Sequence, residues 1–88
     1  MKPTILLSTK NYEYLADEIL ALTDFEKAEL TRQTFSDGES YYRIENNLQN
    51  KRAIVLGATT SESDTMELYD LASAAVDMGC SSLHLLVP

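Results

Sequence analysis

The chain has 88 residues, of which 44% are hydrophobic and 24% are charged, a mixture typical of a globular domain and not of a disordered acidic tail. Its formal net charge of −7 disfavours anionic surfaces, so we expect neither a nucleic acid nor a membrane as partner. No apolar run approaches the roughly 18 residues of a membrane span, and the single cysteine, Cys80, cannot form an internal disulfide. Together these features predict a soluble cytoplasmic protein.

The first 22 residues are typical of a strand followed by a helix. Residues 4–8 contain an unbroken Ile-Leu-Leu run, which predicts a short strand buried on both faces. Apolar residues then recur at helical spacing over residues 12–22, and Asn11 is a candidate N-cap. The acids of this helix, including Glu13 and Asp17, are interpreted as a solvated face without a cationic or metal partner.

The middle of the chain predicts a β-hairpin. Residues 27–35 alternate with a period of two and modest hydrophobicity, which indicates a half-exposed strand. The Ser-Asp-Gly-Glu cluster of residues 36–39 favours a turn because Gly38 tolerates a positive φ. Residues 40–44 carry aromatic and β-branched side chains and form the expected return strand.

The last third predicts strand, helix and strand. Residues 53–56 form an apolar strand, and a long helix is expected to begin near Asp64, with Ser63 or Asp64 as its cap. Gly79 is placed to end that helix in a left-handed conformation. Residues 83–87 are apolar enough to predict a strand in the centre of a sheet. The apolar stripe of the helix comprises Leu68, Leu71, Ala72, Ala75 and Val76.

This order of elements predicts an α/β fold, namely a three-layer, mostly parallel sheet with a β-hairpin. Open sheets of this class bind ligands at the carboxyl ends of their strands. With three glycines in all, the chain has neither a dinucleotide-binding glycine pattern nor a P-loop. We therefore interpret residues 57–61 as a capped connection between strand and helix, although their amides could also face an anion.

Few side chains indicate chemistry. His84 lies in a predicted strand without a motif around it, and Cys80 has no basic neighbour that would favour a thiolate, so we expect no catalytic residue. The remaining candidates are Phe35, Asp37 and Glu39 on the hairpin loop. Either Phe35 anchors the hairpin in the core, or its ring stacks on a planar base while the two carboxylates accept hydrogen bonds from an exocyclic amine.

At this loop the sequence resembles a known family. Residues 32–45 read Arg-Gln-Thr-Phe-Ser-Asp-Gly-Glu-Ser-Tyr-Tyr-Arg-Ile-Glu and are similar to the Phe-Ser-Asp-Gly-Glu segment of ribose-phosphate pyrophosphokinases, also called phosphoribosyl pyrophosphate synthetases. Residues 5–19, 66–68 and 85–88 resemble further segments of that family in the same order. The resemblance covers essentially the whole chain and implies that residues 1–88 are part of a phosphoribosyltransferase-like N-terminal domain.

The resemblance implies an activity for the full-length enzyme, which transfers pyrophosphate from ATP to ribose 5-phosphate with Mg²⁺ and works as a homo-oligomer. It also implies that Phe35 stacks on the adenine of ATP while Asp37 and Glu39 hydrogen-bond to it across a subunit interface. The family's catalytic and ribose-phosphate loops have no counterpart in residues 1–88, so we expect neither catalytic residues nor metal ligands here. Residues 47–50 and 57–60 depart from the family pattern. In the family, the segment that corresponds to residues 47–50 is associated with a regulatory phosphate or nucleotide contact.

Three hypotheses follow. The leading one is an N-terminal fragment of a ribose-phosphate pyrophosphokinase that contributes adenine contacts and a subunit interface and is inactive alone. The second is a non-catalytic interaction module that associates with a complete synthetase and modulates it. The third is a generic small α/β protein whose hairpin imitates the motif.

Overall fold

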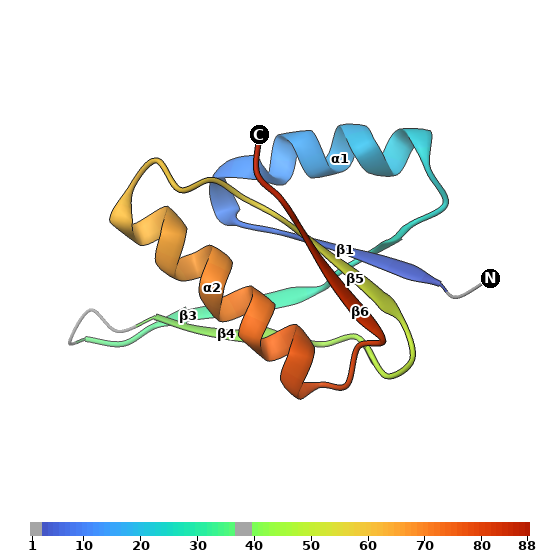
Figure 1. Cartoon of the computed structure of the whole chain (residues 1–88). Helices are drawn as coiled ribbons and strands as arrows, with labels where there is room; N and C mark the ends of the chain where they lie inside the picture. The colour runs from blue at the N-terminus through green and yellow to red at the C-terminus, as the bar shows by residue number, and fades with distance from the viewer. Residues whose placement is uncertain (1–2, 37–39) are drawn as a thin grey trace.

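The computed structural model describes residues 3–36 and 40–88 (Figure 1). The elements in chain order are β1 (Thr4–Ser8), the short 3₁₀ helix η1 (Lys10–Tyr12), α1 (Glu13–Leu22), β2 (Glu26–Lys27), β3 (Leu30–Thr34), β4 (Ser40–Ile44), β5 (Arg52–Leu56), α2 (Glu62–Asp77) and β6 (Ser82–Leu86). Within the described residues, no helix is both long and apolar enough to cross a membrane.

Two sheets form from the described strands. The first, called here the parallel sheet, has the strand order β2-β1-β5-β6, with every neighbouring pair parallel. The second contains only β3 and β4, which pair antiparallel with Thr34 opposite Ser40. This second sheet, residues 30–34 and 40–44, is called the hairpin arm, and in Figure 1 it runs away from the parallel sheet. The predicted α/β fold with a parallel sheet and a hairpin is confirmed.

The two helices cover opposite faces of the parallel sheet because side chains alternate along its strands. On one face, Ile5 and Leu7 of β1 pack with Leu71 of α2 in a cluster that also contains Ala53 and Val55 of β5. On the other face, Leu6 and Leu56 pack with Ala16 of α1. Both faces of β1 and β5 are therefore buried, as their unbroken apolar runs predict.

Both predicted helix caps are wrong. Asn11 lies in η1, and its Nδ2 donates to Asp64 Oδ1 of α2 at 2.7 Å instead of capping α1. Helix α2 begins earlier than predicted because Ser61 has extended backbone and its Oγ accepts from the Asp64 N–H at 3.1 Å. Gly79 does follow α2 with a φ of +85°, which confirms its predicted left-handed conformation.

The predicted strand over residues 27–35 is in fact two strands with different partners. Residues 26–27 pair with β1, whereas residues 30–34 belong to the hairpin arm. Between them, the Ala28 N–H donates to Leu6 O at 3.0 Å and the Glu29 N–H donates to Asn46 Oδ1 at 2.6 Å. The chain therefore leaves the parallel sheet between residues 27 and 30. The alternation of side chains with a period of two continues through this break, so the sequence pattern does not reveal it.

The last strand is also placed differently from its prediction. Among the described strands, β6 is at the edge of the parallel sheet and pairs with β5 alone. Consequently Leu85 is 53% exposed, and Leu86 and Val87 are exposed as well.

Candidate functional site

Phe35 directly follows β3 on the hairpin arm, and its side chain is 53% exposed. The hydrophobic clusters of the core do not include it among the residues described. The interpretation of Phe35 as a core anchor is therefore wrong. The other two predicted site residues, Asp37 and Glu39, lie outside the described residues.

The base of the hairpin arm is anchored by apolar and backbone contacts. Leu30, Tyr42 and Ile44 pack in the cluster beneath α2, and Ile44 is only 6% exposed. The Glu45 N–H donates to Glu29 O at 2.8 Å, which closes the base. The part of the arm nearest Phe35 thus extends from a buried root.

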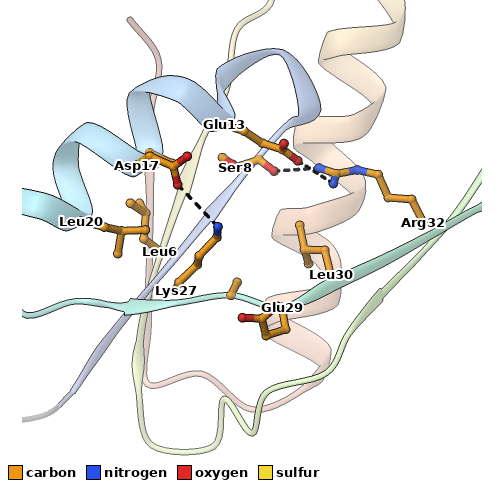
Figure 2. A pocket seen from close by; sticks show the side chains of 11 residues that line it. Leu6, Ser8, Glu13, Asp17, Leu20, Lys27, Glu29, Leu30 and Arg32 are labelled. Atoms are coloured by element: carbon orange, nitrogen blue, oxygen red, sulfur yellow. Dashed lines mark hydrogen bonds and ion pairs between the residues drawn. The ribbon is translucent and has the colours of Figure 1, made fainter.

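Arg32 connects the hairpin arm to three other elements. Its Nη1 donates to Glu13 Oε1 of α1 at 2.9 Å, and its Nη2 donates to the backbone oxygen of Ser8, at the end of β1, at 3.1 Å (Figure 2). The same Nη2 donates to Glu67 Oε2 of α2 at 3.0 Å, and Nε lies 3.3 Å from that oxygen. Glu67 is buried, with 8% exposure, and also accepts the Lys10 N–H at 3.0 Å.

The acids of α1 are exposed to solvent, as predicted, but two of them have the cationic partners that the sequence did not suggest. Glu13 pairs with Arg32, and Asp17 lies 3.5 Å from Lys27 Nζ. Figure 2 shows both pairs at a pocket between α1 and the segment that joins β2 to β3. Because each cation arrives from residues 27–32, helical spacing alone could not identify the pairs.

The pocket itself has a volume of about 200 Å³. Leu6, Leu20 and Leu30 line its apolar part. The two cationic side chains that line it, Lys27 and Arg32, are paired with carboxylates of α1. An anionic ligand would have to displace these carboxylates, so the pocket has none of the free cationic charge that a phosphate requires.

The carboxyl ends of β1 and β5 meet tightly. Thr9 is fully buried, and its Oγ1 has no hydrogen-bond partner among the described residues. A Cβ atom on Gly57 would lie 2.7 Å from Thr9 Cγ2 and 3.1 Å from Leu68 Cδ1. Glycine is therefore required at residue 57 by close packing, and the loop from Gly57 leads to the Ser61 cap of α2.

The two other titratable candidates from the sequence, His84 and Cys80, lie outside the pocket. His84 lies exposed on β6, and Cys80 is half-buried against the core. In residues 3–36 and 40–88, no group of three or more His, Cys, Asp or Glu side chains gathers to hold a metal ion.

Sequence reasoning missed Arg32 and Glu67. A signal for Glu67 existed, because it lies at helical spacing from Asp64, Leu71 and Ala75, all of which are buried. A carboxylate on a buried stripe needs a cation or several donors, and Arg32 meets that need.

Comparisons with known proteins identify one family. A family model described as the N-terminal domain of ribose phosphate pyrophosphokinase matches residues 4–88. Ribose-phosphate pyrophosphokinases from two strains of Halobacterium salinarum are each 27% identical to the chain over 84 residues, which cover 96% of the chain and 30% of each relative. The chain therefore spans about a third of the length of the curated relatives it matches.

Solved structures share the fold. A phosphoribosylpyrophosphate synthetase from Mycobacterium smegmatis matches with a TM-score of 0.88 at 20% identity, over 99% of this chain and 30% of that one. A purine phosphoribosyltransferase from Pyrococcus horikoshii matches with a TM-score of 0.71 at 12% identity, over 98% of this chain and 59% of that one.

Proposed function

The chain belongs to the family of ribose-phosphate pyrophosphokinase N-terminal domains. We propose that it works as the N-terminal part of such an enzyme. In this role residues 1–88 contribute adenine contacts and a subunit interface. The whole enzyme transfers the pyrophosphoryl group of ATP to ribose 5-phosphate with Mg²⁺, as a homo-oligomer in the cytoplasm.

The observation that carries the adenine contact is the exposed ring of Phe35 at the end of β3. Stacking of a base on an aromatic ring contributes about 1–3 kcal/mol, and a net hydrogen bond about 0.5–1.5 kcal/mol. Millimolar affinity requires about 4.1 kcal/mol, which Phe35 with Asp37 and Glu39 would barely reach. The proposed half-site therefore needs a second protein surface to hold ATP.

Electrostatics support the proposal that phosphate and Mg²⁺ binding reside elsewhere in the enzyme. Lys27, Arg32, Arg43 and Lys51 each pair with a carboxylate. Pyrophosphoryl transfer depends on positioning and on cations that stabilise developing negative charge. We accordingly propose that the 88-residue chain is inactive alone.

The exposed face of β6 and α2 supports a role within a larger folded unit. Tyr69, Val76 and Leu85 are all more than half exposed, and they border an apolar groove of about 400 Å³. An open edge strand beside exposed apolar side chains is a surface that proteins usually cover. The same face favours the second candidate function, a non-catalytic module that associates with a complete synthetase.

A chimera tests the leading proposal. Residues 4–88 replace the matched segment of the Halobacterium salinarum enzyme, and AMP formation from ATP and ribose 5-phosphate is measured with Mg²⁺. We expect an active chimera in which Phe35→Ala raises the KM for ATP. Tyr14→Ala is the matched control, because Tyr14 is also an aromatic residue that is more than half exposed, on α1, and it should leave KM unchanged.

Three results would contradict parts of the proposal. Turnover by the isolated chain would show that it is active alone. An unchanged KM in the Phe35→Ala chimera would exclude the adenine contact. Inhibition or activation of the intact enzyme by added 88-residue chain, together with an inactive chimera, would favour the interaction module.

A further inference from the structure

The hairpin arm is attached to the rest of the molecule through a charged residue, Arg32, to which the family resemblance assigns no role. Arg32 lies in the middle of β3 and is bonded to α1, α2 and the end of β1. Its residue number places it three residues before Phe35, a distance of about 10 Å along an extended strand. A rotation of β3 at Arg32 would therefore be transmitted to Phe35.

Glu67 is the partner that makes this attachment specific. Its Oε2 accepts from Arg32 Nη2 at 3.0 Å, from Arg32 Nε at 3.3 Å and from the Lys10 N–H at 3.0 Å. The side chain is only 10% exposed, so a carboxylate without Arg32 would be buried with the Lys10 N–H as its donor. Separating a buried carboxylate from its cation costs free energy, because the charge is left without a partner. The ion pair therefore favours the one orientation of the arm in which Arg32 reaches Glu67 of α2.

Besides Arg32, the arm is held by apolar packing against the core beneath α2 and by hydrogen bonds at its base. Its strands do not pair with any strand of the parallel sheet in the described residues. Leu30, Tyr42 and Ile44 pack its root against the core, but apolar packing tolerates small rotations that a guanidinium with three partners does not.

We propose that Arg32 and Glu67 are positioning residues whose ion pair sets the direction of the hairpin arm and thereby the placement of Phe35. The contribution to nucleotide placement rests on the proposed adenine contact, whereas the control of the arm's direction does not. Buried ion pairs contribute unevenly to stability, so the role assigned to this pair is a defined orientation of the arm.

Residual dipolar couplings of the backbone amides test the proposal on the 88-residue chain. The variant Arg32→Met/Glu67→Gln removes both charges, and the new amide oxygen can still accept from the Lys10 N–H. We expect a folded parallel sheet whose couplings are preserved, while the couplings of residues 30–34 and 42–44 shrink or no longer fit the same alignment. A role in stability alone would lower the melting temperature and leave the arm's couplings in the folded molecule unchanged.

Arg43→Met is the matched control. Arg43 is also an arginine of the hairpin arm, but its pair with Glu45 at 3.1 Å is exposed. Its removal should leave the couplings of the arm in place. If the double variant fails to fold, Arg32→Lys is used, which keeps the charge but loses the planar fork, and it should reduce the couplings of the arm partially.

The outcomes separate the two proposals. Unchanged arm couplings in the folded variant overturn the positioning role. Altered arm couplings, with a raised KM for ATP and a preserved kcat in the chimera, support the full inference. Altered couplings in a protein whose Phe35→Ala chimera keeps its KM support the control of the arm's direction and overturn the proposed adenine contact instead.

Discussion

The parallel sheet and the hairpin arm are held in place by different forces. In the parallel sheet, β1 and β5 are buried on both faces. Leu7 of β1 and Leu71 of α2, the helix that packs on this sheet, have no exposed surface. The hairpin arm packs only its root into the core and is tied to the other elements by the polar contacts of Arg32. Stability is therefore concentrated in the sheet, while the arm is free to carry a side chain such as Phe35 that contributes little to folding.

The largest expected contrast between these regions comes from two truncations to alanine. Leu71→Ala removes a fully buried side chain of α2 and should destabilise the protein by about 2–5 kcal/mol, because a cavity remains. Phe35→Ala should change stability by less than about 0.5 kcal/mol, since the ring is half exposed. Urea unfolding measures both. A comparable loss of unfolding free energy in the two variants would contradict the conclusion that stability is concentrated in the sheet.

The close packing at the carboxyl ends of β1 and β5 gives the next effect. Gly57→Ala places a Cβ 2.7 Å from Thr9 Cγ2 and should cost about 1–3 kcal/mol through overpacking. Adding Thr9→Ala removes the clashing methyl group and should recover part of that loss in a double-mutant cycle. Additive losses would show that the contact between these residues is not the cause.

The cap of α2 provides a smaller test inside the same half of the molecule. Ser61→Ala removes the hydroxyl that accepts the Asp64 N–H and should cost about 0.5–2 kcal/mol. Ser63→Ala is the comparison, because Ser63 lies within the helix and its Oγ reaches the Ser61 Oγ at 3.3 Å, so it should lower the thermal unfolding midpoint less than Ser61→Ala. A larger loss at Ser63 would restore the cap predicted from sequence.

The junction between the two regions should respond to pH. Glu26 of β2 accepts from Lys51 Nζ at 2.9 Å and from Asn46 Nδ2 at 2.6 Å. These two hydrogen bonds, of which the one from Lys51 has the larger effect, lower the pKa of the Glu26 carboxyl below its ordinary value of 4.5. Because the unfolded chain binds this proton more tightly, the contribution is complete above that ordinary value and is lost as the pH falls through the lowered pKa.

Urea midpoints measured against pH test this sign. The difference in stability between the protein and its Glu26→Gln variant should be constant near neutral pH and should shrink as the medium becomes acidic below pH 4.5. A difference that grows in acid would contradict the assigned direction. Asp17→Asn is the matched control, because the pair of Asp17 with Lys27 is largely exposed and its removal should change stability little at any pH.

The elements themselves were predictable where hydrophobic period and burial agree. The apolar runs of β1 and β5 and the turn at Gly79 follow from local pattern, and each is present. Of the apolar stripe predicted for α2, Leu68, Leu71 and Ala75 are buried, whereas Val76 is 56% exposed. The break between β2 and β3 was not predictable, because both segments alternate with the same period and differ only in which strand they pair with. The candidate site was predicted as a motif, of which the structure describes Phe35 and its exposure.

Local periodicity, turn residues and a contiguous motif are enough to specify the class of fold, the order of the elements and the resemblance that leads to the family. Which charges meet depends instead on how the elements pack. Arg32 and Glu67 are 35 positions apart, and the Lys10 N–H that shares the same carboxylate is 57 positions from it. Contacts over such separations arise only after the helices pack on the sheet, since no local spacing constrains them.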